Sequence, residues 1–356
     1  MKTLLQYLED KEKIYIFGIG KKGKFIRRWL EYKCKKIAGF VSSDEYISDK
    51  VVDNVPVYPI SAFECGQRDC LVIGASYSFY NEIMPSIIER QIPNVFFVDS
   101  DEYSMAGFEL KLVDLGIDLS KEMLDIAGFK VPNMFALNAN TDMILSLDYE
   151  FCDLVWPYLG DDSRLIEGPY EYNNVKLKSD DVVLDCGANI GLFSARAASL
   201  GCKVYAFEPL PDIRKYLNMV KNEYRNNVSV VPMAAGERQE SCEMLWCKDN
   251  PGSSNIVGFE TRNTETIDVD VISIDEFVNE HKLERVDFIK ADIEGAERLM
   301  LSGAKETLKR YAPKLSICTY HLPDDVTVLT KLIKEANPEY NIEYGWRKLY
   351  AWVGDC

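Results

Sequence analysis

One stretch of the sequence, residues 182–194, constrains the fold of this chain more than any other. It begins with an apolar run typical of a buried strand, passes through closely spaced glycines, and continues with helical spacing up to residue 200. A strand that turns through glycines into a helix N-terminus forms a cradle, because glycines let a ligand approach the backbone amides. The stretch therefore predicts an α/β fold with a parallel, Rossmann-like sheet and a cofactor site at the turn.

The polar residues of this turn indicate the charge of the cofactor. The strand ends in Asp185, and Gly187, Asn189 and Gly191 follow at alternate positions. A carboxylate attracts a cationic ligand and repels a pyrophosphate. S-adenosylmethionine carries a sulfonium and an ammonium group, so we expect these four residues to bind S-adenosylmethionine.

The next two predicted strands add to the same site. Strand 203–207 ends in Glu208, and an acidic residue at this place can accept hydrogen bonds from both ribose hydroxyls of an adenosine cofactor. Strand 228–231 leads into small residues, among which Ala234 is expected to lie beside the adenine. Each piece is common, but their order and spacing together favour a methyltransferase.

A later strand, predicted at 286–291, delivers further carboxylates to the edge of the sheet where open α/β sheets bind ligands. Asp292 is expected to act in the reaction and Glu294 to bind the substrate. The alternative for the acidic residues here is that they stabilise the N-terminus of the following helix. We favour a functional role for Asp292 because it stands at a strand end.

His321 follows the strand predicted at 314–319, on the same expected edge. A histidine there can take a proton from a substrate hydroxyl near neutral pH. Its alternative role is to cap the next helix. A divalent cation that bridges Asp292 and the acceptor oxygen would be a second route to the same activation. The sequence does not separate these routes, and we predict no metal site from it.

Upstream of the cofactor strand, Tyr170 and Glu171 belong to a Gly-Pro turn. They are expected to cover the site and contact the substrate, although such a turn also serves as a simple connection.

The first hundred residues contain a second glycine turn, Gly18-x-Gly20-x-x-Gly23, between a predicted strand and helix. It predicts either a nucleotide site, with Asp44 on a ribose, or glycines kept for strand–helix packing, which we favour. We predict a small Rossmann-like accessory domain at 1–102 and a helical connecting segment at 103–165, which includes helical spacing at 120–127. A methyltransferase domain is expected at 166–356.

Composition narrows the class of protein. A net charge of −16 disfavours an extended nucleic-acid surface. No apolar run approaches the roughly 20 residues that span a bilayer, and the first residues lack a signal peptide. The ten cysteines include no Cys-x-x-Cys pair, which favours a cytoplasmic protein with reduced thiols. The oligomeric state is not predicted.

Taken together, residues from about 166 to 353 resemble the FkbM-type methyltransferases. The matching segments are 167–171 (EGPYE), 185–194 (DCGANIGLFS), 207–209 (FEP), 273–277 (SIDEF), 287–297 (DFIKADIEGAE) and 320–321 (YH). One departure is Ala291, where the family usually has a larger apolar residue.

The resemblance implies a seven-stranded class I methyltransferase sheet. It also implies S-adenosylmethionine-dependent O-methylation of a sugar hydroxyl in a glycan, a glycolipid or a nucleotide sugar. Two alternatives remain: a nicotinamide-dependent oxidoreductase that uses the first glycine turn, and a non-enzymatic nucleotide- or glycan-binding protein.

Overall fold

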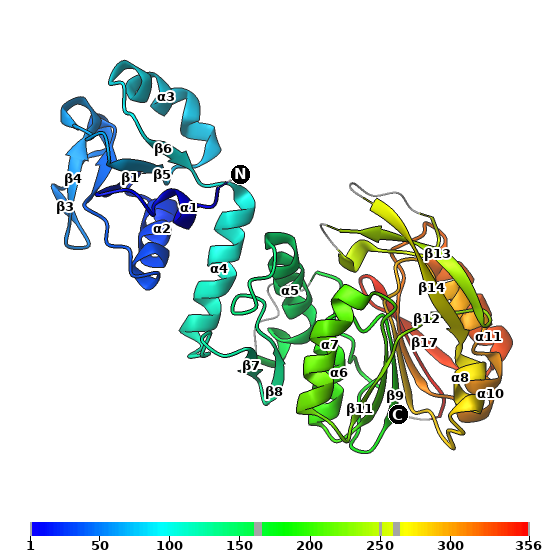
Figure 1. Cartoon of the computed structure of the whole chain (residues 1–356). Coiled ribbons are helices and arrows are strands. Elements are labelled where there is room, and N and C mark those ends of the chain that lie inside the picture. Colours follow the sequence, from blue (N-terminus) through cyan, green and yellow to red (C-terminus); the bar gives the residue numbers. More distant parts are fainter. Residues whose placement is uncertain (1, 160–165, 249–250, 259–263, 355–356) are drawn as a thin grey trace. The chain divides into compact units, whose positions relative to one another are not determined.

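The computed structural model describes residues 2–159, 166–248, 251–258 and 264–354 (Figure 1). The chain divides into two compact units, Met1–Leu115 and Gly116–Cys356. The boundary expected at residue 102 therefore falls inside a helix of the first unit, and residues 160–165 of the expected connecting segment lie outside the described residues. The three-part division stays a prediction.

The first unit is an α/β domain built on a sheet of order β3-β4-β2-β1-β5-β6, in which only β3 runs antiparallel to its neighbour. Its strands are β1 (Ile14–Phe17), β2 (Gly39–Ser42), β3 (Val51–Val52), β4 (Val55–Pro59), β5 (Cys70–Ile73) and β6 (Val95–Phe97). Its helices are α1 (Leu4–Tyr7), α2 (Lys21–Tyr32), α3 (Tyr80–Glu89) and α4 (Ser100–Asp114), with short 3₁₀ turns at η1 (Asp44–Tyr46), η2 (Ile60–Ala62) and η3 (Tyr77–Phe79).

Close packing accounts for the glycines of the turn between β1 and α2. A Cβ atom on Gly23 would lie 1.9 Å from the carbonyl oxygen of Gly18, which itself has a φ of +107°. A Cβ on Gly74, after β5, would lie 2.8 Å from the Cα atom of Gly23. These contacts hold β1, α2 and β5 close together, and they support the packing interpretation of the motif.

The second unit is built on a seven-stranded sheet of order β11-β10-β9-β15-β16-β18-β17. All neighbours pair in parallel except β18, which is antiparallel to both β16 and β17. The strands are β9 (Val182–Cys186), β10 (Lys203–Phe207), β11 (Val228–Val231), β15 (Phe288–Ala291), β16 (Lys314–Cys318), β17 (Asn341–Tyr344) and β18 (Lys348–Trp352). This is the expected class I methyltransferase sheet, and the 182–194 stretch begins with β9, an interior strand of the sheet between β10 and β15.

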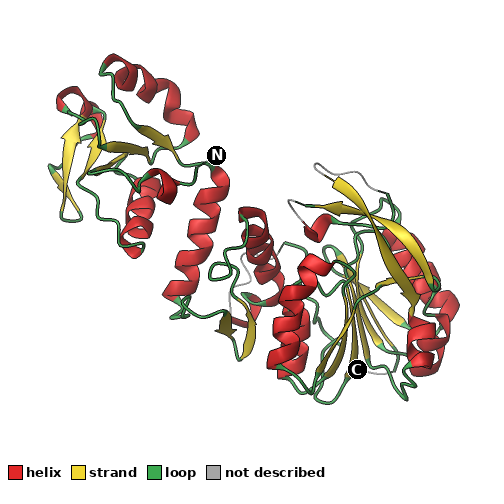
Figure 2. Cartoon of the chain, in the orientation of Figure 1, coloured by secondary structure: helices red, strands yellow, loops and turns green. Residues whose placement is uncertain are grey.

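Helices cover both faces of this sheet (Figures 1 and 2). One side carries α6 (Leu192–Ser199) and α7 (Pro211–Glu223), and the other carries α8 (Ile274–Glu280), α9 (Glu297–Ser302), α10 (Lys305–Tyr311) and α11 (Asp325–Ala336). The core between the sheet and the second set of helices is buried and apolar, with Phe207, Phe277 and Ile289 fully enclosed. A smaller sheet of order β12-β14-β13 consists of β12 (Ala234–Gly236), β13 (Glu240–Cys247) and β14 (Thr264–Ser273).

The segment before β9 differs from the prediction in one element. Residues 120–127 were expected to have helical structure, but β7 (Met123–Ile126) and β8 (Phe129–Pro132) form an antiparallel hairpin. Ala127 and Gly128 both have positive φ, at 51° and 86°, as a two-residue hairpin turn requires. Alternate residues of β7 are buried, and so are Phe129 and Val131 of β8 together with Pro132 at its end, so most of the apolar pattern has the strand period of two.

The hairpin is followed by α5 (Thr141–Leu154) and the 3₁₀ turn η4 (Pro157–Leu159), and a further 3₁₀ turn, η6 (Pro251–Ser253), follows β13. No helix in the described part of the chain combines the length and the apolar character needed to cross a bilayer.

Candidate active site

A cavity of about 510 Å³ opens at the carboxyl ends of β9, β10 and β15, within the second unit. This volume suits a ligand of nucleoside size. Among its described lining residues, carboxylates outnumber cations by seven to two. The carboxylates are Asp142, Glu150, Asp153, Glu167, Glu208, Asp292 and Glu294, and the cations are Lys290 and Arg347. The excess of acidic side chains favours a cationic ligand, because its charge would stabilise their ionised forms.

The glycine turn forms one wall of this cavity, because Gly187 and Asn189 both line it. Gly187 has a φ of +76°, and a Cβ atom on it would lie 1.9 Å from the carbonyl oxygen of Asp292. Gly191 has a φ of +96° and packs against Leu217 of α7, so it shapes the entry into α6 and is not among the described lining residues. The turn is thus pressed against the end of β15.

Asp185 lies beneath the turn and is fully buried, and it is not among the described residues that line the cavity. Its Oδ2 accepts a hydrogen bond of 2.6 Å from the Ser194 hydroxyl, and its Oδ1 lies 3.3 Å from Lys290 Nζ. Lys290 in turn donates a 2.6 Å hydrogen bond to the carbonyl oxygen of Gly187. Asp185 therefore supports the turn through Lys290, and its direct contact with the cofactor stays a prediction.

Glu208 lies at one end of the cavity, where two backbone amides hold its carboxylate in place. Its Oε2 accepts a hydrogen bond from Asn189 N at 3.1 Å, and its Oε1 accepts one from Leu210 N at 2.9 Å. Burial raises the pKa of Glu208 to about 7, although these amides and nearby cations oppose the rise. Small and apolar residues adjoin it, with Ala234, Ala235 and Met244 in the lining.

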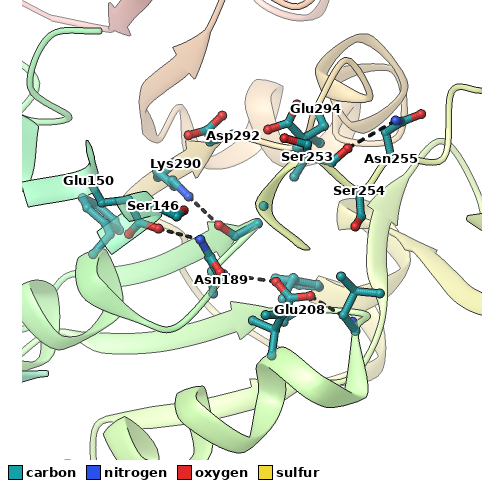
Figure 3. Close-up of a pocket in the computed structure, with 18 of the residues that line it drawn as sticks. Ser146, Glu150, Asn189, Glu208, Ser253, Ser254, Asn255, Lys290, Asp292 and Glu294 are labelled. Carbon is teal, nitrogen blue, oxygen red and sulfur yellow. Dashed lines mark hydrogen bonds between the residues drawn. The ribbon is translucent and has the colours of Figure 1, made fainter. Parts of the chain in front are cut away.

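Glu150 is a lining residue that the sequence did not reveal. It projects from α5, and its Oε1 accepts a 2.5 Å hydrogen bond from Asn189 Nδ2 (Figure 3). Burial raises its pKa to about 8. The only sequence signal was a polar stripe of one helical face, formed by Asp142, Ser146, Glu150 and Asp153, in a segment outside the resemblance.

Asp292 and Glu294 lie together at the end of the cavity opposite Glu208 (Figure 3). Tyr170 Oη donates a 2.5 Å hydrogen bond to Asp292 Oδ2, and Tyr320 Oη lies 3.4 Å from Oδ1. Burial would raise the pKa of Asp292, but nearby cations, with Lys290 foremost, hold it below its usual range. Burial raises the pKa of Glu294 to about 8, and the charge of Asp292 adds to this shift.

His321 stands directly behind these two carboxylates and is not among the described lining residues. Its Nε2 lies 3.5 Å from Glu294 Oε2 and 3.7 Å from Asp292 Oδ1, and its Nδ1 lies 3.1 Å from Glu297 Oε1. Burial lowers the pKa of the ring, but the surrounding carboxylates, with Glu297 foremost, raise it to about 9. A ring that holds a proton at neutral pH is a poor general base, so the expected base role of His321 stays a prediction.

The Gly-Pro turn brings only one of its two expected residues to the cavity. Tyr170 lines it, whereas Glu171 points to a different place: its Oε1 accepts a hydrogen bond from Leu177 N at 3.1 Å, and its Oε2 lies 3.4 Å from Arg196 Nε. The Nζ atom of buried Lys348 lies 4.4 Å from the centre of the Tyr170 ring. Tyr170 is therefore firmly placed beside Asp292.

The sheet order and the acidic cavity at its carboxyl edge define a class I methyltransferase domain. Residues 185–340 match the model of the Methyltransferase FkbM domain. This match confirms, for a little under half of the chain, the resemblance that the sequence motifs predicted.

Curated relatives support the same family. Hexuronic acid methyltransferase AglP of Haloferax volcanii is 30% identical over 160 residues, which is 45% of this chain and 64% of AglP. Methyltransferase sdnD of Sordaria araneosa is 28% identical over 167 residues, 38% of this chain and 64% of sdnD. The chain thus spans less than two thirds of either relative. A solved FkbM methyltransferase from Methylobacillus flagellatus is 18% identical to this chain, with a TM-score of 0.41. The match covers 97% of this chain and 90% of the Methylobacillus chain.

Proposed function

We propose that this chain is an S-adenosylmethionine-dependent O-methyltransferase that methylates a sugar hydroxyl of a glycan, a glycolipid or a nucleotide sugar. The observation that carries the proposal is the arrangement of the acidic cavity on the FkbM domain. Glu208 is fixed by amides at one end, and Asp292 and Glu294 lie at the other. One end thus offers acceptors for a ribose, and the other offers polar groups for an acceptor substrate.

The lining fits the cofactor in both shape and charge. Glu208 would accept hydrogen bonds from the ribose hydroxyls, since its amide partners leave further lone pairs on both oxygens. Ala234 and its apolar neighbours would lie along the adenine. Glu150, beside Asn189, would pair with the cofactor ammonium. When bound, S-adenosylmethionine supplies a methyl group that its sulfonium already activates.

The chain itself would mainly align the acceptor, an effect worth about 7–11 kcal/mol at best. Asp292 is proposed as the catalytic residue, because it lines the cavity end and the hydroxyls of Tyr170 and Tyr320 hold its carboxylate in place. Glu294 is proposed to bind the substrate. His321 would act through these two carboxylates, as a positioning residue.

The acceptor class is the least defined part of the proposal. AglP is named as a hexuronic acid methyltransferase, and Arg347 lines the cavity of this chain as a cation that could pair with a uronate carboxylate. Acceptors that contain a hexuronic acid are therefore the first to test. No observation favours the nicotinamide-dependent or the non-enzymatic alternative.

The proposal is tested in two stages with the full chain. Calorimetric titration with S-adenosylmethionine should show saturable binding at one site per chain. Transfer of a labelled methyl group to nucleotide sugars and lipid-linked glycans, with and without a hexuronic acid, should then give a product whose methylated oxygen is located by mass spectrometry. Folded protein that does not bind the cofactor would overturn the proposal.

A further inference from the structure

Three side chains from two neighbouring strand ends converge at the Asp292 end of the cavity. The carboxylates of Asp292 and Glu294 follow β15, and the imidazole of His321 follows β16. One potential ligand atom from each lies within 4.8 Å of the other two. Two ligand atoms that are each about 2.1 Å from one ion lie roughly 3.0–3.6 Å apart at ordinary ligand angles. The separations of 3.5 Å and 3.7 Å from His321 Nε2 are close to this range.

The imidazole is the decisive member of this cluster, because it is buried and points into it. The side chain of His321 is only 5% exposed, and neither of its ring nitrogens makes a hydrogen bond to a described residue, although carboxylate oxygens lie 3.1 Å from Nδ1 and 3.5 Å and 3.7 Å from Nε2. A buried polar atom without a partner costs free energy, so such an atom calls for an explanation. Here Nε2 faces the two carboxylates, which themselves line the cavity.

The other side of the ring is oriented as in known metal sites. Nδ1 lies 3.1 Å from Glu297 Oε1, and the Glu297 side chain is fully buried. A histidine that binds a metal almost always turns its second ring nitrogen towards a carboxylate, a carbonyl or water, which fixes the ring and the tautomer. Glu297 is itself anchored, since its Oε1 accepts a 2.8 Å hydrogen bond from Ile293 N.

The two carboxylate oxygens of Asp292 have different neighbours, as the two ring nitrogens of His321 do. Its Oδ2 accepts the hydrogen bond from Tyr170, and its Oδ1, which accepts a longer hydrogen bond of 3.4 Å from Tyr320 Oη, lies 3.7 Å from His321 Nε2. Glu294 adopts a φ of +54° and is followed by Gly295 at +95°, so the chain turns sharply straight after β15. This turn keeps Glu294 beside Asp292 at the cavity.

We propose that Asp292 Oδ1, a Glu294 carboxylate oxygen and His321 Nε2 bind a divalent metal ion at the cavity end opposite Glu208. One imidazole and two carboxylates favour a first-row transition ion such as Mn²⁺ over Mg²⁺ or Ca²⁺, which prefer oxygen ligands alone. Glu297 is the residue that orients the imidazole. Three protein ligands leave positions on the ion that open into the cavity.

The role of the ion in catalysis rests on the proposed function. An acceptor hydroxyl on an open position would lose its proton more readily, as Lewis-acid ions cause. In the transfer, the oxygen–carbon bond forms, the carbon–sulfur bond breaks with its electron pair on sulfur, and the hydroxyl proton passes to solvent. The ion would also hold the acceptor oxygen at one end of the cavity, opposite the ribose site.

The test uses the full chain, stripped of metal with a chelator and titrated with Mn²⁺ alone. Electron paramagnetic resonance of the free ion should show one bound Mn²⁺ per chain, and electron spin echo modulation should reveal a nitrogen ligand. His321→Gln should abolish the nitrogen signal, and Glu294→Gln should weaken binding by at least about tenfold; Glu297→Gln, at the orienting carboxylate, should weaken it by about 10–100-fold.

The matched control is His281→Gln, which changes the other histidine of the chain, stacked on Phe277. It should keep both the affinity and the nitrogen signal. Circular dichroism of each variant separates loss of binding from loss of fold. Absent Mn²⁺ binding, or equal binding by wild type and a folded His321→Gln variant, overturns the proposal and leaves the cluster as an ion-pair network.

Failure of this proposal is distinguishable from failure of the proposed function, because Mn²⁺ is titrated without cofactor or acceptor. Binding of Mn²⁺ with no binding of S-adenosylmethionine would retain the metal site and reject the methyltransferase function. Binding of the cofactor with no Mn²⁺ site would do the reverse.

Discussion

The two glycine turns of this chain occupy the same place in two different sheets, each between a parallel strand and the following helix. In the first unit, Gly18 and Gly23 serve mutual close contact. Asp44 after the next strand accepts a hydrogen bond from Ser61 N at 3.2 Å, and it lines a surface hollow whose described lining includes no glycine of the turn. In the second unit, Glu208 after the next strand faces a cavity, and Asp292 lies across from it. A glycine turn alone therefore permits close packing, whereas the carboxylates of neighbouring strands make a site.

The largest effect is expected for Gly187→Ala. The added Cβ would lie 1.9 Å from the backbone oxygen of Asp292, at a φ of +76°. Strain and overpacking together should lower the free energy of unfolding by about 3 kcal/mol or more. Binding of S-adenosylmethionine should be lost as well. Denaturant unfolding and calorimetry measure the two effects, and a variant with wild-type stability and affinity would contradict this close approach.

Gly23→Ala should destabilise the first unit and leave the second intact. Its Cβ would meet the Gly18 carbonyl oxygen, so we expect a loss of about 2–3 kcal/mol, seen as faster hydrogen exchange in residues 1–115 only. Gly20→Ala is the control, because its Cβ has no atom within 4 Å and should cost less than about 1 kcal/mol. Loss of cofactor affinity in Gly23→Ala would assign the first turn to the cofactor.

Glu208→Gln tests whether the carboxylate that follows β10 in the second unit binds the cofactor. Loss of a charged acceptor for the ribose hydroxyls should weaken S-adenosylmethionine binding by about 10–100-fold, since hydrogen bonds to charged groups contribute roughly 1.5–3 kcal/mol. Asp44→Asn, the matched change after β2 in the first unit, should leave this affinity unchanged. Equal affinities of the two variants in calorimetry would remove Glu208 from the cofactor site.

A smaller effect is expected from pH. Burial raises the pKa of Glu208 to about 7, so the carboxyl is partly protonated just below neutral pH and accepts the ribose hydroxyls less well. Cofactor affinity should fall by up to about tenfold per pH unit below pH 7. Because the folded pKa exceeds the unfolded one, Glu208 stabilises the fold below about pH 4.5, and this contribution is lost as the pH rises through 7. In Glu208→Gln the pH dependence of affinity should flatten; an unchanged profile would assign it to other groups.

The sequence predicted those features of the fold and the site that depend on a single strand and the residues next to it. The positions of most strands along the chain, the carboxylates at their ends and the position of the glycine turn follow from apolar runs and the residues that close them. Asp185 shows the limit of this reasoning. Its burial depends on Lys290, its direct neighbour in the register between β9 and β15, and the two residues are far apart in sequence.

The position of Glu150 and the β7–β8 hairpin also depend on contacts that the local sequence does not reveal. Glu150 reaches the cavity only because α5 packs beside the turn, and a polar stripe on a helix is otherwise typical of a solvated face. In the hairpin, the apolar residues of a short strand also fit a helical spacing. Only their pairing across Ala127 and Gly128 decides between the two.

The contact between Gly187 and the backbone of Asp292 has a consequence for how substrate preference can change in such a protein. The turn and the end of β15 form one rigid wall, so the span from Glu208 to Asp292 is set by the sheet and cannot be tuned by a side chain. Room for a larger or smaller acceptor must come from the other lining segments. These segments include α5, beside the turn, and Ser253 and Ser254 near η6 on the far side of the cavity from α5, and a change in them would leave the donor-to-acceptor span constant.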